Sequence, residues 1–332
     1  MTEPRYDVLA IGNAIVDVIA QSDDAQLAEL GLAKGGMTLI DANRAESLYA
    51  AMGPGREISG GSAANTLAGL AALGRKCAFI GQVADDQLGA VFAHDVRATG
   101  IDYATPMAPA DGVPTARCLI FVTPDGERTM NTFLGASQSL PAASIDEALI
   151  RDAAILYLEG YLWDPEEARG AMRRAIAVAR AAGRTVAFTL SDGFVIARHG
   201  ADFRALLDEG QIDILFANEG EITALAETAD CDSAIETVAP KVPLLVVTRS
   251  EQGALAVRGG ERAQVPAERV ASVIDTTGAG DLFAAGFLAG HGAGESLERC
   301  LRMGAIAAAE VISHYGARPE ADLRALMAHG LS

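Results

Sequence analysis

The sequence predicts an α/β protein with a central, mainly parallel sheet covered by helices on both faces, together with a small β lid. Short apolar runs alternate with helical segments along most of the chain, a rhythm typical of parallel strands joined by helices. Several of these runs are apolar at every position, as expected for strands buried on both faces. At residues 115–133, two strand-like runs flank an Asp-Gly turn. This hairpin interrupts the rhythm and predicts the lid.

Composition limits the classes of function. The 332 residues are 50% hydrophobic and 21% charged, which is enough to bury a large core. No apolar run is long enough to cross a membrane, and residues 1–7 do not resemble a signal peptide, so we expect a cytoplasmic protein without a membrane partner. The four cysteines have no paired spacing and are expected to be reduced thiols. A net charge of −18 argues against nucleic-acid binding through a broad basic face.

The first apolar run, residues 6–12, predicts a buried opening strand of the parallel sheet. Asn13 and Asp17 follow its end, where open α/β sheets bind ligands. The spacing of Asn13 and Asp17 could place both side chains on one side of an extended segment, although Asn and Asp at strand ends are also common turn formers. No Gly-x-Gly-x-x-Gly is present here, which argues against a dinucleotide-binding start.

Residues 15–20 and 37–40 predict strands outside the main sheet, flanking a helical or loop stretch at residues 25–30, and we place part of the lid there. Residues 67–74 predict a helix rich in small residues, preceded by the Gly60-Gly61 pair. Close packing against a sheet explains the Ala and Gly content, but it does not explain the polar Asn65. A strand at 77–83 and a helix at 88–99 are expected next.

The alternation of strands and helices resumes near residue 154. We expect strands at 155–158, 186–190, 212–217 and 244–248, helices at 165–182 and 203–207, and an edge hairpin at 254–257 and 262–265. Asn218 and Glu221 directly follow the third of these strands. Their oxygens could hold Mg²⁺ through water, or they could serve as the cap and the acidic first turn of a helix. The loop from Thr248 to Gly253 follows the fourth strand.

Residues 271–286 form the stretch around which the chain is organised: a short β-like run, a glycine-bearing turn and an apolar helix. The small residues Gly278, Ala279 and Gly280 allow a ligand to approach the backbone, and the unpaired N–H groups of a helix start favour an anion. Asp281 would repel that anion, so a catalytic role as a general base is one explanation; an acidic residue that stabilises the helix start is the other. Helices are expected over residues 279–290, 297–313 and 321–329.

Three features taken together resemble the PfkB, or ribokinase, family of carbohydrate kinases over essentially the whole chain: Gly60-Gly61 with Asn65, Asn218 with Glu221, and Asp275-Thr-Thr-Gly-Ala-Gly-Asp281 with Gly286. The resemblance implies a ribokinase-like three-layer α/β/α sandwich. Residues 1–13, 41–114 and 133–332 would form the large catalytic domain, and residues 14–40 and 115–132 the small β lid. Asn13, Asp17 and the segments 191–199 and 215–222 look most like adenosine kinases.

The resemblance also implies roles for individual residues in an ATP-dependent phosphorylation of a primary hydroxyl, such as adenosine to AMP in purine salvage. Asp281 would be the base, and the backbone at Gly278, Ala279 and Gly280 the anion hole. The acceptor pocket would comprise Asn13, Asp17, Gly61 and Asn65, with Arg128 reaching the phosphates from the lid. ATP contacts are expected from Asn218, Thr248, Ser250, Gly253, Thr276, Gly278 and Gly280. Asn218 and Glu221 would position Mg²⁺ through water, and a K⁺ ion at Asp275 and Thr277 is left open.

Other functions remain open at this point. A sugar kinase acting on ribose or a related sugar would use the same catalytic parts, whereas a nucleoside acceptor needs an apolar slot, for which Met37, Phe133 and Tyr161 are candidates. A non-catalytic nucleoside-binding protein on the same fold would have no use for Asp281. The segment 314–318 departs from the family pattern near the nucleotide base or cation loop. We expect a monomer or a homodimer.

Overall fold

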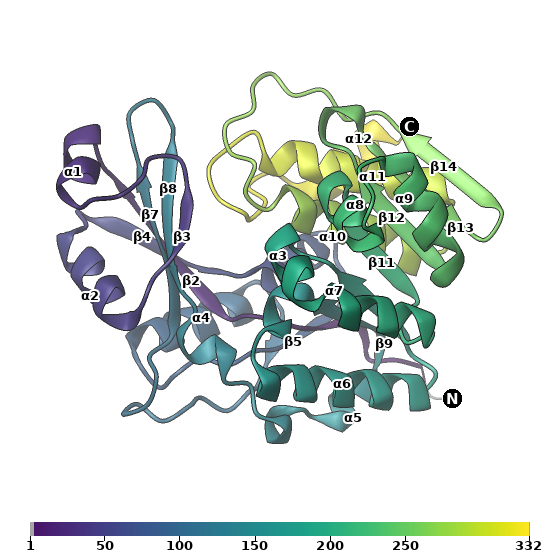
Figure 1. Cartoon of the computed structure of the whole chain (residues 1–332), viewed down its shortest axis with the longest axis horizontal. Helices are drawn as coiled ribbons and strands as arrows, with labels where there is room; N and C mark the ends of the chain where they lie inside the picture. The colour runs from purple at the N-terminus through teal and green to yellow at the C-terminus, as the bar shows by residue number, and fades with distance from the viewer. Residues whose placement is uncertain (1–2, 332) are drawn as a thin grey trace.

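Two β-sheets organise the chain in the computed structural model, which describes residues 3–331 (Figure 1). The larger sheet contains β1 (Tyr6–Ile11), β5 (Cys77–Ile80), β6 (Asp102–Tyr103), β9 (Ala153–Glu159), β10 (Thr185–Thr189), β11 (Ile214–Asn218), β12 (Leu244–Thr248), β13 (Ala254–Arg258) and β14 (Glu261–Val265). Its order is β14-β13-β12-β11-β10-β9-β1-β5-β6. The smaller sheet contains β2 (Ile15–Gln21), β3 (Met37–Leu39), β4 (Gly55–Gly60), β7 (Ala116–Val122) and β8 (Arg128–Phe133), in the order β3-β8-β7-β2-β4.

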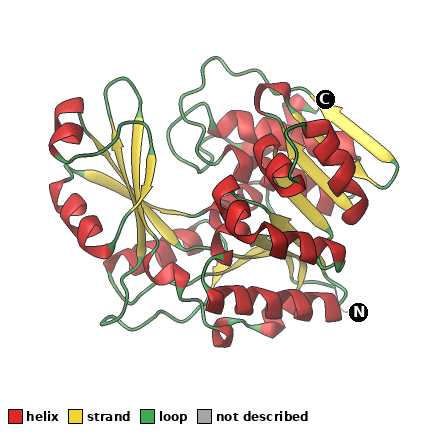
Figure 2. Ribbon diagram, in the orientation of Figure 1, coloured by secondary structure: helices red, strands yellow, loops and turns green. Residues whose placement is uncertain are grey.

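Helices cover both faces of the larger sheet, as Figure 2 shows. One face packs against α3 (Ser62–Ala72), α4 (Gln87–Ala98), α10 (Ala279–Gly292) and α11 (Leu297–Val311), with α12 (Leu323–Gly330) outside them. The other packs against α5 (Glu147–Arg151), α6 (Glu166–Ala181), α7 (Gly193–Asp208), α8 (Glu219–Ala226) and α9 (Cys231–Val238). Along β1, Val8 and Ala10 belong to the first core and Leu9 and Ile11 to the second, because strand side chains alternate between faces. The predicted three-layer α/β/α architecture is confirmed.

The smaller sheet carries α1 (Asp24–Glu29) and α2 (Ala42–Ala51) on the side away from the large sheet (Figure 1). Short 3-10 helices occur at Gly135–Gln138, Ala142–Ser144, Gly160–Trp163, Ala239–Lys241 and Ser250–Gln252. Leu27 and Leu48 of the two helices pack into the same core as Leu119 and Phe121 of β7. The four cysteines of the chain are buried free thiols. Within residues 3–331, no helix combines the length and apolarity needed to span a bilayer.

Three differences from the sequence prediction concern the boundary of the lid, the start of α7 and the run before the glycine turn. Residues 41–60, assigned above to the large domain, instead supply α2 and β4 to the smaller sheet, because β4 pairs antiparallel with β2 and places Ile58 opposite Asp17. Helix α7 begins at Gly193, ten residues before the predicted start, since Asp192 caps it by accepting the N–H of Phe194. The β-like run before the glycine turn joins no sheet, and Val273 and Ile274 are exposed.

Candidate active site

The candidate site lies where the chain crosses between the two sheets. Strand β1 ends at Ile11 and β2 begins at Ile15, so Asn13 lies in the first crossing. Strand β4 ends at Gly60 and α3 begins at Ser62, which makes the second crossing. Both crossings are at the carboxyl ends of the parallel strands, the edge at which open α/β sheets bind ligands.

Asp281 lies in the first turn of α10 and faces the second crossing. Its Oδ1 accepts a hydrogen bond from Ser62 Oγ at 2.6 Å, and its Oδ2 accepts one from Asn65 Nδ2 at 3.1 Å. Loss of hydration raises the pKa of the Asp281 carboxyl, against the lowering influence of these two donors and of the Arg318 charge. A carboxylate with a raised pKa is a stronger base, and its two donors fix its orientation.

Gly278, which caps α10, and Gly280, in its first turn, differ in the space available for a side chain. Gly278 adopts the left-handed conformation with φ 79°, and a Cβ atom there would lie 2.7 Å from the Cβ of Ala317. Gly280 is exposed, and a Cβ atom there would meet no other atom within 4 Å. Gly278 therefore shapes the turn, while Gly280 keeps the space in front of the helix start open.

The N–H groups at this helix start are not equivalent. The N–H of Ala279 donates to the Thr276 carbonyl at 3.2 Å, whereas those of Gly280 and Asp281 have no acceptor among residues 3–331. An anion placed at the start of α10 would meet these two unpaired donors and the positive end of the helix dipole. Ala279 is thus a weaker candidate for the anion hole than the sequence alone indicates, because its donor is already used.

Asp17, on β2, differs from the other carboxylates of the site. No hydrogen bond to its side chain is present in the described part of the chain, and a Cβ atom at Gly60 would lie 2.6 Å from its Oδ2. The enclosed position raises the pKa of Asp17 to about 6, while Arg128 and Arg318 act in the opposite direction and Asp281 adds to the rise. A carboxylate without protein donors is free to accept hydroxyl groups of a ligand.

Asn13, in contrast, is fully engaged with the protein. Its N–H and its Nδ2 both donate to Glu159 Oε1, at 2.7 and 2.8 Å, and its Oδ1 accepts from Ser137 Oγ at 2.8 Å. In this arrangement Asn13 joins the first crossing to β9. The Gly61 backbone, at φ 95°, lies against it, since a Cβ atom at Gly61 would be 2.2 Å from the Asn13 carbonyl oxygen.

Glu159 is a site residue that sequence reasoning missed. It ends β9, is fully buried, and its Oε2 accepts the N–H of Ala63 at 2.8 Å in the first turn of α3. Burial raises the pKa of Glu159 to about 7, against the donors from Asn13 and Ala63. The available signal was its position, an acidic residue closing an otherwise apolar strand at the same edge as Asn13.

Arg128 is brought together with Asp275 and Thr277. Its guanidinium forms a buried ion pair with Asp275, and its Nη1 donates to Thr277 Oγ1 at 3.1 Å. Asp275 also accepts from the N–H and Oγ1 of Thr277 and from the N–H of Gly316. The guanidinium thus supplies the positive charge that a K⁺ ion at Asp275 and Thr277 would have contributed. These residues therefore do not fit a K⁺ site. Arg128 is also engaged here rather than free to reach a phosphate.

Asn218 and Glu221 form a reciprocal cap at the start of α8. The Asn218 side chain accepts from the Glu221 N–H at 2.8 Å, while Glu221 accepts the N–H and the Nδ2 of Asn218 at 2.9 and 2.8 Å. Burial raises the pKa of Glu221 to about 7, and the charges of Asp192 and Asp281 add to the rise. The described residues contain no cluster of three or more His, Cys, Asp or Glu side chains that could hold a metal directly.

This donor set fits an outer-shell role toward Mg²⁺ bound to a nucleotide. The cap fixes the position of the Glu221 side chain but neutralises its negative charge only in part. A nearby cation would favour the ionised form of Glu221. The cap itself supplies one carboxylate and one amide, so a complete coordination shell would also need water and phosphate oxygens.

The loop after β12 lies beside Asn218. Thr248 pairs with Asn218 in the register of β11 and β12. Ser250 has a positive φ of 48°, and Gly253 has φ 88° with its N–H donating to the Ser250 carbonyl at 3.1 Å. A Cβ atom at Gly253 would lie 2.0 Å from the Val265 carbonyl oxygen. This tight turn keeps the loop next to the carboxyl end of β11, as expected for a nucleotide-contacting segment.

The three candidates for a base slot come from different parts of the fold. Met37 is 45% exposed on the edge strand β3, and Phe133 ends the adjacent strand β8, under the guanidinium of Arg117. Tyr161 follows β9 and packs against the Phe194 ring at a centroid distance of 6.0 Å. Met37 and Phe133 therefore share the smaller sheet, whereas Tyr161 lies in the 3-10 helix that follows β9 of the larger one.

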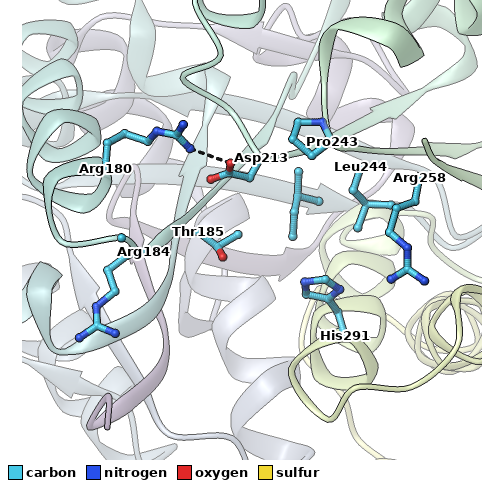
Figure 3. A pocket seen from close by; sticks show the side chains of 10 residues that line it. Arg180, Arg184, Thr185, Asp213, Pro243, Leu244, Arg258 and His291 are labelled. Carbon is cyan, nitrogen blue, oxygen red and sulfur yellow. Dashed lines mark hydrogen bonds and ion pairs between the residues drawn. The ribbon is translucent and has the colours of Figure 1, made fainter. Parts of the chain in front are cut away.

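A cavity of about 480 Å³ lies at the opposite edge of the large sheet (Figure 3). Thr185, Asp213 and Leu244 of its lining are at or next to the amino ends of β10, β11 and β12. Its arginines are engaged with the protein: Arg180 pairs with Asp213 at 2.6 Å and Arg258 with Glu261 at 2.8 Å. The strands separate this cavity from Asp281, so it is not part of the candidate site.

Comparison with known proteins agrees with this geometry. The sequence profile of the pfkB family carbohydrate kinases matches residues 7–323. The chain belongs to this family. Membership makes it a phosphotransferase that acts on a hydroxyl group of a sugar or nucleoside, and it implies ATP as the phosphoryl donor.

The relatives differ in the acceptor that their names state. The adenosine kinase of Sinorhizobium meliloti is 50% identical, with 98% of this chain and 99% of that chain covered and a TM-score of 0.90. A protein described as a probable sugar kinase from Rhizobium etli is 47% identical, with 99% and 100% covered and a TM-score of 0.91. Fructokinase-1 of rice is 31% identical over 69% of this chain and 72% of its own length. The 5-dehydro-2-deoxygluconokinase of Halalkalibacterium halodurans is 27% identical over 95% and 91%.

Proposed function

We propose that this kinase transfers the γ-phosphoryl group of ATP to the 5′-hydroxyl of adenosine, giving AMP and ADP. The observation that carries the proposal is the free Asp17 carboxylate, held beside Gly60 at the turn that also orients the base Asp281. A ribose ring offers a pair of vicinal hydroxyls for such a carboxylate and a primary hydroxyl for the base. The similarity to the Sinorhizobium adenosine kinase supports the nucleoside as the acceptor.

In the proposed reaction, the 5′-hydroxyl loses its proton to Asp281 while its oxygen attacks the γ-phosphorus. The new O–P bond forms as the P–O bond to the β-phosphate breaks, and ADP leaves with that bonding pair. The unpaired N–H groups of Gly280 and Asp281 stabilise the negative charge on the transferring group without having to reorganise. Ser62 and Asn65 hold the Asp281 carboxylate in place during the transfer.

Mg²⁺ bound to the nucleotide would neutralise phosphate charge, with Asn218 and Glu221 orienting its water ligands. Thr248, Ser250, Gly253 and Thr276 are proposed as contacts of ATP along the loop after β12 and the turn before α10. Asp17 is proposed to bind the sugar, with Gly61 and Asn65 at its side. Asn13 acts one step further away, because both polar atoms of its side chain are already bound to Glu159 and Ser137.

A free sugar is the second candidate acceptor. It is favoured by the Rhizobium neighbour and by the fructokinase and 5-dehydro-2-deoxygluconokinase relatives, whose names state sugar or sugar-acid substrates. The same Asp17 and Asp281 would serve that reaction. What separates the two acceptors is the binding energy of a base, which a free sugar lacks.

The test is side-by-side kinetics with adenosine, inosine, cytidine, ribose, fructose and 5-dehydro-2-deoxygluconate at saturating Mg·ATP. Adenosine should exceed ribose in kcat/KM by at least about ten- to a hundredfold, since stacking of a base contributes about 1–3 kcal/mol. The matched control is 5′-deoxyadenosine, which should bind and inhibit competitively but accept no phosphoryl group. A higher kcat/KM for any free sugar would overturn the adenosine assignment.

A further inference from the structure

Arg318 lies in the segment after α11 and clamps the turn between β4 and α3. Its Nε and Nη2 donate to the Ser59 carbonyl at 3.1 and 2.9 Å, Nη2 also donates to Ser59 Oγ at 3.2 Å, and Nη1 donates to the Ala64 carbonyl at 3.1 Å. These bonds bridge the two ends of the Gly60-Gly61 turn. The guanidinium fork therefore fixes the path of this turn from outside.

The clamped turn carries the groups that touch both functional carboxylates. Gly60 lies against Asp17, and Ser62 and Asn65 donate to Asp281. A displacement of this turn would move the donors of Asp281 and the wall of the Asp17 site together. Arg318 is thus placed to control the geometry of both without contacting either through a hydrogen bond.

The residues just before Arg318 extend this connection to the anion hole. The Gly316 N–H donates to Asp275 Oδ2 at 2.9 Å, and Ala317 packs directly against Gly278. Residues 316–318 therefore join the start of α10 to the turn between β4 and α3. One short segment near the C-terminus therefore holds both the start of α10 and the turn between β4 and α3.

The guanidinium of Arg318 is held by neutral oxygens. All of its hydrogen bonds in the described part of the chain go to carbonyl and hydroxyl oxygens, and no carboxylate forms a salt bridge with it. A direct salt bridge would occupy oxygen lone pairs that Asp17 needs for hydroxyl groups and Asp281 needs for a proton. A cation held on neutral oxygens stabilises nearby carboxylates and leaves their lone pairs free.

We propose that Arg318 is a positioning residue for the kinase reaction, which holds the turn between β4 and α3 and supplies one positive charge shared by Asp17 and Asp281. This role rests on the proposed function of those two residues. The charge of Arg318 lowers the pKa of both carboxyls, in opposition to the loss of hydration that raises them. Conversely, both carboxylates oppose the burial that lowers the pKa of Arg318 to about 10.

Other titratable groups face the same site and set the background for any pH effect. They are Arg128 on β8, Cys118 on β7, Asp95 on α4, Tyr157 and Glu159 on β9, Glu221 on α8 and Tyr161 after β9. None of them donates to both ends of the turn between β4 and α3. A change in the pH profile that depends on the charge at position 318 can therefore be distinguished from the titration of these neighbours.

The first experiment compares pH profiles of kcat and kcat/KM for the wild type, Arg318→Gln and Arg318→Lys, using the best acceptor of the panel. Arg318→Gln should move the acid limb upward by about one pH unit, because loss of an opposite charge raises a carboxyl pKa, and should raise the acceptor KM about tenfold. Arg318→Lys should keep the acid limb within about 0.3 pH units while still raising KM, because it retains the charge and loses the fork. Arg299→Gln, at an exposed arginine of α11, should change neither.

The second experiment needs no substrate. The carboxyl carbons of Asp17 and Asp281 are titrated by ¹³C NMR in the wild type and in Arg318→Gln, with assignments from Asp17→Asn and Asp281→Asn. Both pKa values should rise in Arg318→Gln. If this shift is seen but no acceptor reacts, the proposed reaction fails and the role of Arg318 stands. If the folded variant shows unchanged carboxyl pKa values and a pH-independent loss of activity, the charge role is overturned.

Discussion

Replacing Asp281 by Asn should separate catalysis from folding. In the wild type, Ser62 and Asn65 donate to the two carboxylate oxygens at 2.6 and 3.1 Å. The asparagine oxygen can still accept from Ser62, but its amino group would face the amino group of Asn65. Asn65 can resolve this conflict by turning its amide, because its Oδ1 is buried without a partner and would then accept. Both hydrogen bonds should survive.

The expected magnitude follows from what is lost and what is kept. Loss of a positioned base should lower kcat by about 10²–10⁴, which corresponds to about 3–5 kcal/mol of activation free energy. Stability at pH 8 should not fall, because the raised pKa of Asp281 shows that its ionised form is disfavoured in the folded protein. The Kd for ATP should stay within about threefold, since the substitution retains the shape of the side chain.

The assay is ADP release at saturating adenosine and Mg·ATP, combined with thermal melting and calorimetric titration of ATP. Ser62→Ala is the matched control, because it removes one donor to the carboxylate and keeps the base, and it should cost about tenfold or less in kcat. A folded Asp281→Asn protein with kcat within tenfold of the wild type would refute the assignment of the base.

Four further outcomes are expected. Asp17→Asn should raise the acceptor KM at least tenfold and leave the ATP KM within about twofold, because charge-assisted hydrogen bonds contribute about 1.5–3 kcal/mol each; parallel loss of both affinities would contradict the sugar contact. Gly278→Ala should lower the Tm by several degrees, since φ 79° costs a non-glycine residue about 1–2 kcal/mol and the methyl group meets Ala317 at 2.7 Å. Gly280→Ala should keep the Tm and lower kcat more than tenfold by filling the space before the N–H groups; equal effects at the two glycines would contradict this division of roles. The pKa of Glu159 is raised from 4.5 to about 7, so between these pH values the folded state holds a proton that the unfolded state lacks. The free energy of unfolding should therefore fall by roughly 3 kcal/mol as pH rises through this range. Urea midpoints measured at pH 5 and 7 should decrease less in Glu159→Gln than in the wild type, and identical decreases would rule out Glu159 as the source of the pH dependence.

The sequence by itself determined the layers of the fold, and it predicted residues 278–281 as the catalytic turn. Buried parallel strands are apolar at every position and their helices repeat with a different period, so the α/β alternation is visible in the residues. The turn at 278–281 is equally local, because a left-handed glycine, an open glycine and a first-turn carboxylate are neighbours in the chain. Asp17 was found for the same reason, as a polar residue directly after the first crossing.

The tertiary structure alone decided which distant residues act together. Glu159 joins Asn13 across 146 residues, and Arg318 joins Ser59 across 259, contacts that no local pattern encodes. The tertiary structure also places β4 in the smaller sheet instead of the large domain. There it pairs with β2, a strand far from it in the sequence. Hydrogen bonds and buried charges depend on spatial neighbours, and a buried polar group is stable only where the fold supplies a partner. For that reason the sequence could predict Asp281 as the base, while only the structure showed that Ser62 and Asn65 hold its carboxylate.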